Sequence, residues 1–122
     1  MPQCYPFRAM LEAGLIVAFS SDGPVIGDIN PLLGLRSAAL RRTRSGRAIA
    51  PEQAIAVEQA LWCYTAGSAV VSGQAARLGR LAPGFLADLA VLSADPLAVP
   101  VEQLLEIKVE QTFVGGKLLY EG

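Results

Sequence analysis

GLIVAFSSDGPV (residues 14–25) decides the fold, because an unbroken apolar run leads straight into a polar turn. Leu15 to Phe19 shows no alternation of apolar and polar residues, which is typical of a strand covered on both faces, as in a parallel sheet under helices. Ser20, Ser21 and Asp22 follow at the point where that strand should end. The stretch therefore predicts a buried strand with one carboxylate at its mouth.

Helix signals flank the predicted strand on both sides. Pro6 is favoured as the first residue of a helix, and Gly14 is a favoured residue just past a helix end. Asn30 and Pro31 suit the N-cap and first residue of a second helix. The apolar stripe expected on this second helix consists of Leu32, Leu35, Ala39 and Leu40. The order of helix, buried strand and helix indicates an α/β arrangement.

A longer helical stretch follows the second helix. The spacing of apolar residues predicts a helix over residues 51–64. Trp62 and Tyr64 lie at helical spacing beside apolar neighbours and are interpreted as core. A short helix over residues 66–72 should stop at Gly73.

Beyond about residue 77 the pattern changes to that of strands. The Pro83-Gly84 pair predicts a turn before the first of them. Strands are expected over residues 88–92, 109–114 and 117–120. Gly115 and Gly116 can supply the positive φ angles of a two-residue hairpin turn between the last two strands. The end of the chain is therefore expected to be a β segment.

The composition argues against two classes of partner. With 10 basic and 11 acidic residues the net charge is −1, which does not favour nucleic acid or an anionic membrane as the partner. An arginine cluster without interleaved aromatic residues is expected to form a solvated helix end and loop; it comprises Arg36, Arg41, Arg42, Arg44 and Arg47. No segment approaches the roughly 20 apolar residues of a membrane span. The chain is therefore expected to be cytoplasmic.

The most informative count in the sequence is that of histidine, which is zero. This removes the Ser-His-Asp triad, the Cys-His pair and every histidine metal site from this chain taken alone. Cys4 and Cys63 lie far apart without a metal-binding or redox spacing, so reduced, cytoplasmic thiols are expected, and a single disulfide is the alternative. Any catalysis by this chain is therefore carboxylate-based or incomplete.

Five segments in a fixed order carry a family resemblance. They are SSDGPV (20–25), NPLLGLRSAALRR (30–42), PEQAIAVEQALWCYTAGSAVVSG (51–73), GRLAPGFLADLAVLSADP (79–96) and VEQTFVGGKLLYEG (109–122). Together they resemble the end of a metal-dependent amidohydrolase, in the branch that contains D-aminoacylases and N-substituted formamide deformylases. The last two segments are the specific part of this resemblance, whereas the first would be a weak signal by itself.

The resemblance implies a fold of which this chain is one portion. The family's complete protein is several times longer, and is a (β/α)₈ barrel that carries a small β-sandwich made from both chain ends. Residues 1–77 would supply the last strand and helices of the barrel, and residues 78–122 the C-terminal strands of the sandwich. One or two divalent metals, most often zinc, lie at the mouth of the barrel, held by histidines on earlier strands. The implied class is α/β, and no metal is expected to bind this chain alone.

Asp22 matches the aspartate that follows the last barrel strand in this family. The resemblance implies that Asp22 is both a metal ligand and the catalytic base that takes a proton from the water that the metal activates. A carboxylate at the C-terminal end of a barrel strand suits that role, because it can accept a proton and later pass it to the leaving nitrogen. On the residues alone the alternative is an Asx-turn, in which Asp22 bonds the backbone near Gly23 and Pro24.

Four other polar residues receive separate interpretations. Asp28 is expected to be a loop or capping residue. Asp88 should bond turn amides close to the start of its strand. Arg36 and Arg42 are secondary candidates for contact with a substrate.

The resemblance predicts the C-terminal part of an enzyme that hydrolyses a non-peptide carbon–nitrogen bond in a small-molecule amide, formamide or cyclic amide. The isolated chain should be inactive. The alternative is a naturally short, non-catalytic association module derived from the same family. A third alternative is a fragment expressed from the larger chain, and it predicts the same upstream sequence as the C-terminal part of an enzyme does. Because 52% of the residues are hydrophobic, apolar faces should remain exposed, and a homo-oligomer is the expected state.

Overall fold

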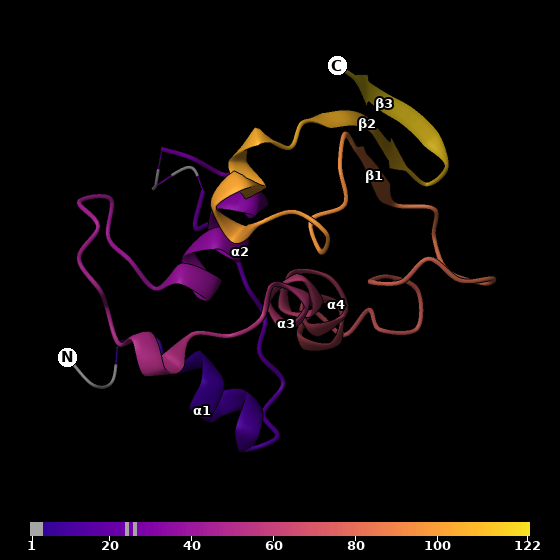
Figure 1. Ribbon diagram of the computed structural model, residues 1–122. Helices are drawn as coiled ribbons and strands as arrows, with labels where there is room; N and C mark the ends of the chain where they lie inside the picture. Colours follow the sequence, from indigo (N-terminus) through magenta and orange to yellow (C-terminus); the bar gives the residue numbers. More distant parts are fainter. Residues whose placement is uncertain (1–3, 24, 26) are drawn as a thin grey trace.

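The computed structural model describes residues 4–23, 25 and 27–122, and combines a helical part with a small sheet (Figure 1). Its helices are α1 (Phe7–Glu12), α2 (Pro31–Leu40), α3 (Val57–Trp62) and α4 (Ser68–Val71), and its strands are β1 (Leu89–Leu92), β2 (Val109–Val114) and β3 (Lys117–Glu121). Short 3₁₀ turns lie at Pro51–Gln53 and Val101–Glu106, and a π-helical turn at Cys63–Gly67 joins α3 to α4. No helix in the described part of the chain is long and apolar enough to cross a membrane.

The C-terminal end of α1 and the N-terminal end of α2 have the chemistry that their sequences predict, whereas Pro6 is the N-cap of α1 and not its first residue. Gly14 follows α1 with a φ of +75°, and two backbone hydrogen bonds of 3.0 Å back into the helix complete a Schellman motif. Asn30 caps α2, because its Oδ1 accepts a hydrogen bond from the Leu32 amide at 2.9 Å. Pro31 is the first residue of α2, as expected.

The expected helix over residues 51–64 is wrong in its first turn. Pro51–Gln53 forms a 3₁₀ turn instead, and the chain is extended after it. Two interactions account for this break. The Ile55 amide donates to the Ala38 carbonyl of α2 at 3.3 Å, so the chain packs onto α2 at this point. The Gln59 side chain then accepts from the Ala56 amide at 3.0 Å, and a new helix begins there.

From residue 57 to residue 71 the chain is one continuous helical run, made of α3, the π-helical turn and α4. The short helix expected over residues 66–72 is therefore the last part of a longer one. Gly73 stops the run with a φ of +71°, as the sequence predicts.

The sheet is antiparallel with the strand order β1-β2-β3. β2 and β3 form the expected hairpin, in which Gly115 has a φ of +56° and Gly116 a φ of +78°. Two positive φ angles in succession define a type I′ turn, whose twist matches that of the strands it joins. β3 extends one residue beyond its expected end. The hairpin prediction is confirmed.

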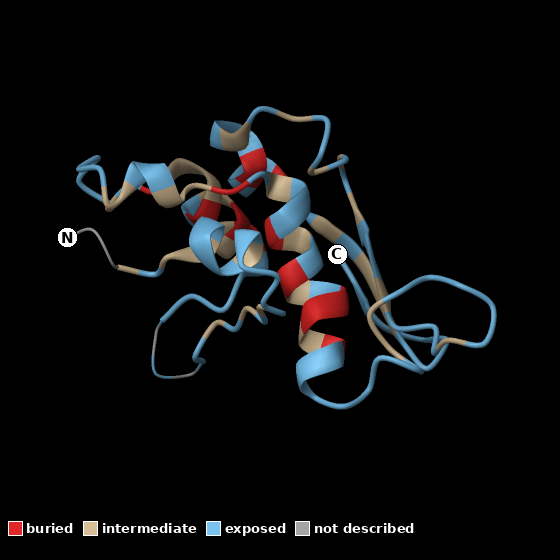
Figure 2. Ribbon diagram, turned by 90° about the horizontal axis from the view of Figure 1, so that it is seen from below, coloured by how far each residue is buried: buried red, intermediate tan, exposed pale blue. Residues whose placement is uncertain are grey.

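The core lies among the helices and not under the sheet. Its buried side chains are Leu32, Leu35, Ala38, Ile55, Ala60, Leu104 and Ile107. They come from α2, α3 and the segments around the two 3₁₀ turns, whereas no residue of the three strands is buried (Figure 2). On α2 the buried stripe uses Ala38 in place of the expected Ala39. Both faces of the sheet therefore remain accessible.

The strand predicted over residues 15–19 is not formed in the structure. The segment belongs to no sheet, and Leu15 and Ile16 are 56% and 52% exposed. A parallel strand needs neighbouring strands to pair with its backbone groups. The sheet that the described residues form is antiparallel and lies at the other end of the sequence, so it offers no such neighbour.

Two expectations about large side chains are also corrected. Trp62 was expected in the core, but it is 40% exposed, while Tyr64 packs against the core as predicted. The arginine cluster is not wholly solvated, because Arg41 is 6% exposed. Its guanidinium group donates to the carbonyls of Cys4 and Ala50 and lies 5.3 Å from the centre of the Phe7 ring. Carbonyl acceptors and an aromatic face thus replace water around this cation.

Replacement of Gly115 and Gly116 by valine should lower the free energy of unfolding by about 1 kcal/mol or more, because β-branched residues are strained at positive φ. Urea denaturation of the double variant measures the loss. Gly27→Val is the control, since an added Cβ at Gly27 meets no atom of the described residues within 4 Å. Equal stability of the double variant and the control would contradict the role of this turn.

Candidate functional site

Asp22 lies in an exposed loop that leaves the helical part of the protein at Phe19. The Phe19 amide donates to the Cys63 carbonyl at 3.1 Å, and the Phe19 ring packs edge-on against Tyr64 with centroids 5.4 Å apart. The Ser68 hydroxyl lies 3.3 Å from the Phe19 carbonyl oxygen. These contacts fix the chain three residues before Asp22.

The chain before Phe19 passes close to the helical run, and Gly67 makes this approach possible. A Cβ atom added at Gly67 would overlap the Val17 carbonyl oxygen and would lie 2.9 Å from the Trp62 ring. Glycine is the residue that permits such an approach between two backbones. The segment over residues 15–19 therefore runs directly over the π-helical turn.

Serine hydroxyl groups organise the turn that contains Asp22. Ser20 Oγ accepts from the Asp22 amide at 3.2 Å, and Ser21 Oγ accepts from the Gly23 amide at 3.3 Å. The Asp22 carbonyl accepts from the Val25 amide at 3.1 Å. Asp22 has a φ of +54°, a left-handed conformation that aspartate adopts more readily than most residues. The backbone of Asp22 is thus held by its neighbours in sequence.

The loop returns to the helical part at the N-terminus of α2. Ile29 packs on Gly23, where an added Cβ would lie only 2.5 Å from its side chain. The Asp28 carboxylate accepts from the Asn30 amide at 2.9 Å, which confirms Asp28 as a loop and capping residue. Asn30 in turn caps α2. The loop is therefore anchored at Phe19 on one side and at α2 on the other.

The side chain of Asp22 is exposed, and within the described residues no group donates a hydrogen bond to its carboxylate. The turn amides that an Asx-turn would use are bonded by the serine hydroxyls or by carbonyl oxygens. Across residues 4–23, 25 and 27–122 no three His, Cys, Asp or Glu side chains gather into a group that could hold a metal ion. Asp22 can therefore offer one oxygen ligand, and the described chain does not supply a site of its own.

The two arginine candidates take no part in the hydrogen bonds that hold this loop. Arg42 is exposed, and its backbone bridges to Ala48. Arg36 is half-buried on α2, and its Nε is enclosed without a hydrogen-bond partner among the described residues. The structure does not bring either one together with Asp22 through a hydrogen bond.

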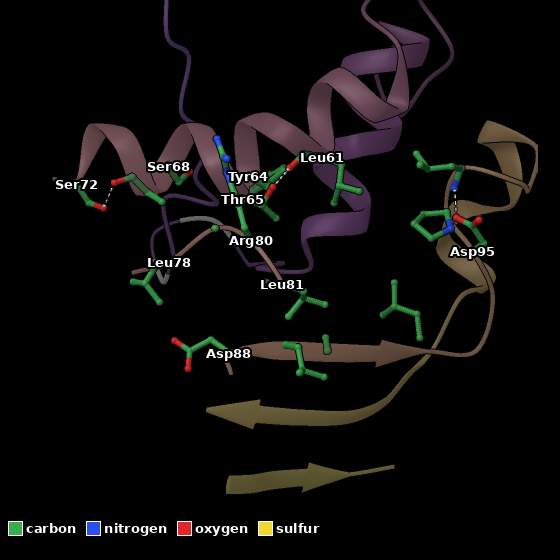
Figure 3. Close-up of a pocket in the computed structure, with 17 residues that line it drawn as sticks. Leu61, Tyr64, Thr65, Ser68, Ser72, Leu78, Arg80, Leu81, Asp88 and Asp95 are labelled. Carbon is green, nitrogen blue, oxygen red and sulfur yellow. Dashed lines mark hydrogen bonds between the residues drawn. The ribbon is translucent and has the colours of Figure 1, made fainter. Parts of the chain in front are cut away.

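An apolar cleft of about 790 Å³ lies between the helical run over residues 57–71 and β1 (Figure 3). Ser68 and Ser72 border it on the helical side and Asp88 on the side of the sheet, and Asp22 is not among the residues that line it. This cleft has no signal in the sequence, because its walls are leucine-rich segments that only the fold brings together. Gly67 and Ser68 likewise carry no sequence signal as supports of the Asp22 loop.

Burial changes the acidity of two groups beside the Phe19 anchor. Removal from water raises the pKa of the Cys63 thiol, and it also raises the pKa of the Tyr64 phenol. Both groups therefore stay protonated at neutral pH. A protonated thiol is a weak nucleophile, so Cys63 has a structural role at this site.

Comparison with known proteins gives one family. An amidohydrolase family model matches residues 1–120. N-substituted formamide deformylase of Arthrobacter pascens is 36% identical over 117 residues, covering 96% of this chain and 21% of that protein. The YtcJ protein of Bacillus subtilis (strain 168) is 32% identical over 124 residues, covering 99% of this chain and 23% of that protein. The chain thus spans about a fifth of the length of these relatives.

A solved structure has a similar fold. An amidohydrolase from Thermotoga maritima MSB8 matches with a TM-score of 0.70 and 23% sequence identity, over 93% of this chain and 25% of that one. The helices and small antiparallel sheet described above therefore occur as a portion of a longer amidohydrolase structure.

Asp88 accepts a hydrogen bond from the Gly115 amide at 2.7 Å, which confirms its predicted bond to a turn amide. Asp88→Ala should lower the free energy of unfolding by about 1 kcal/mol, because this bond ties β1 to the hairpin turn. Asp88→Asn keeps an acceptor oxygen and should lose less. Denaturant titration of the three proteins checks the order, and an alanine variant as stable as the wild type would contradict it.

Proposed function

The chain belongs to the amidohydrolase family, and from this premise we propose that it forms the C-terminal part of a longer hydrolase acting on a carbon–nitrogen bond outside ordinary peptides. The length of the relatives supports this proposal. This chain aligns with about a fifth of each relative, so about four fifths of each has no counterpart in it. The name of the deformylase relative supports a small formamide or related amide as the substrate class.

In this proposal residues 1–77 supply the last strand and helices of a (β/α)₈ barrel, and residues 78–122 supply strands of a β-sandwich. The segment over residues 15–19 supports the first assignment, because it is apolar, belongs to no sheet and exposes Leu15 and Ile16, as a strand would whose neighbours lie outside this chain. The sheet supports the assignment of residues 78–122 to a β-sandwich. None of its residues is buried, and in a sandwich one face of the sheet would be covered by further strands.

A divalent metal, most often zinc in this family, is part of the proposal for the longer protein. Among the described residues of this chain, Asp22 fits one position in the coordination shell of such a metal, and no group of three ligands is present. Asp22 offers a single carboxylate, whereas tight sites usually need three or four protein ligands. The metal would supply its usual chemistry in such enzymes, which is to lower the pKa of a water toward neutrality.

Asp22 is proposed as the ligand and base that this chain contributes. Its carboxylate is exposed and has no hydrogen-bond donor among the described residues, so it can accept a proton from the attacking water. The serine turn holds the backbone of Asp22, which supports a fixed position for this residue after the segment over residues 15–19. Asp22 would then pass the proton to the leaving nitrogen.

Asp22→Asn in the longer protein should reduce kcat by a factor of about 10² to 10⁴, because the amide keeps the shape of the side chain but cannot act as a base. The fold should be unchanged, as measured by circular dichroism and thermal unfolding. Asp28→Asn is the matched control, since Asp28 serves as a capping acceptor and an asparagine can still accept that bond.

In the 122-residue chain alone the same change should leave the metal content near zero, because one carboxylate cannot hold a divalent ion tightly. Elemental analysis after dialysis measures this. Near wild-type turnover by the longer Asp22→Asn variant, or stoichiometric metal in the short chain, would overturn the assignment.

The alternative proposal is that the chain is a short, non-catalytic association module. The observation in its favour is the large apolar area left open on the sheet, where Leu118, Leu119 and Tyr120 of β3 are 46%, 67% and 52% exposed. The coding sequence upstream of Met1 separates the two proposals. An open reading frame with paired histidines supports the longer hydrolase, and its absence supports the module.

The chain on its own should self-associate at micromolar concentration, because β3 is an open edge strand with apolar side chains. Light scattering measures the mass. Leu119→Lys should reduce association, since a lysine on an edge strand opposes pairing with another strand. Leu105→Lys is the control, because Leu105 is also exposed, at 45%, but lies in the 3₁₀ turn and not in a strand. A monomeric wild-type chain would contradict the expectation.

A further inference from the structure

We propose that Ser68 is a positioning residue that fixes Asp22 through the backbone of Phe19, a role that rests on the proposed function of Asp22. The single hydroxyl hydrogen of Ser68 is shared between two carbonyl oxygens, that of Cys63 at 2.8 Å and that of Phe19 at 3.3 Å from Oγ. The Phe19 amide donates to the same Cys63 carbonyl at 3.1 Å. These three contacts form a clamp between the helical run and the chain that leads to Asp22, here called the Phe19 clamp.

The π-helical turn brings the atoms of the Phe19 clamp together. In an α-helix a serine or threonine hydroxyl can bond the carbonyl four residues earlier, as Thr65 does with Leu61 at 2.8 Å. Ser68 instead bonds Cys63, five residues earlier, because the chain between them makes a π turn. Such turns inside α-helices are frequent at functional sites. Here the turn leaves the Cys63 carbonyl available to Phe19.

The Phe19 clamp is the last fixed point before Asp22 in the described chain. The hydrogen bonds of residues 20–23 and 25 join near neighbours in sequence. Earlier in the same segment, Leu15 and Ile16 are more than half exposed and add little restraint. Loss of the Ser68 hydroxyl would therefore loosen the N-terminal side of the loop at the Phe19 carbonyl, while the packing of the Phe19 ring and the α2 side would still hold the loop.

A small release at this point would matter for catalysis. A general base must lie within about 2.6–3.2 Å of the atom whose proton it takes. A displacement of about 1 Å can reduce turnover by about 100-fold, whereas loss of one hydrogen bond in a well-supported loop has a smaller effect. We therefore expect a reduction of about tenfold when the Ser68 hydroxyl is removed.

The test uses the longer protein with its metal. Ser68→Ala should lower kcat about tenfold and change KM less than about twofold. Ser72→Ala is the matched control, because the Ser72 hydroxyl bonds only the Ala69 carbonyl of its own helix, at 3.2 Å (Figure 3). Ser72→Ala should leave both kcat and KM unchanged.

Ser68→Thr keeps the hydroxyl and should restore most of kcat. Should Ser68→Ala fail to fold, Ser68→Cys takes its place, since a thiol has a similar size and donates only weakly.

A double-variant cycle separates this proposal from that for Asp22. If Ser68 acts through Asp22, Ser68→Ala should cost nothing further in the Asp22→Asn background. The same tenfold loss in both backgrounds, a change confined to KM, or a loss equal to that of Ser72→Ala would overturn the positioning role alone. Full activity of Asp22→Asn would overturn the proposed function itself, and the positioning role with it.

Discussion

Burial of Leu104 against α2 is the contact on which the rest of this structure depends. Leu104 is fully buried, and it packs in one cluster with Leu35 of α2 and Ile107 at the entrance to β2. No residue of the three strands is buried, and the contact of the sheet with the core is made by the partly buried Leu92 of β1. The 3₁₀ turn around Leu104 therefore connects the C-terminal part of the chain to the helices. Burial of one leucine contributes about 1.5–3 kcal/mol, a large share of the stability of a small domain.

The remaining apolar residues are arranged for partners that this chain does not contain. Leu15 and Ile16 and the apolar side chains of β3 are exposed to solvent, whereas Phe19 packs against the core. In a complete domain such surfaces are normally covered, because each exposed apolar patch of several hundred Å² favours association. The exposure of these apolar side chains underlies both proposals for function. In the longer hydrolase they would be covered by other parts of the same polypeptide, and in the association module by another chain.

Local chemistry was predictable from the sequence, whereas contacts between distant segments were not. The Asn30 cap, the Gly14 helix end and the Gly115–Gly116 turn each depend on a few neighbouring residues or on a known turn type. The bond of Asp88 was predicted as a bond to a turn amide, but its partner, Gly115, lies 27 residues further along the chain. The strand over residues 15–19 was predicted from an apolar pattern that assumes a sheet around it. At the candidate site, Asp22 could be selected because it follows that pattern. Ser68 could not, because a serine in a helix has no sequence signal for a bond to a segment 49 residues away.

The π-helical turn holds one residue more than an α-helical turn would. A π turn bonds residues five apart and an α-helix bonds residues four apart, so loss of one residue between Cys63 and Gly67 would let the helical run close as a regular α-helix. The serine hydroxyl would then lie four residues after the Cys63 carbonyl, the spacing at which Thr65 bonds Leu61. A deletion in a regular α-helical part of the run has a different consequence, because an α-helix turns by 100° per residue and every later side chain would move to another face. A change in chain length is therefore tolerated better at the π-helical turn than elsewhere in this helical run.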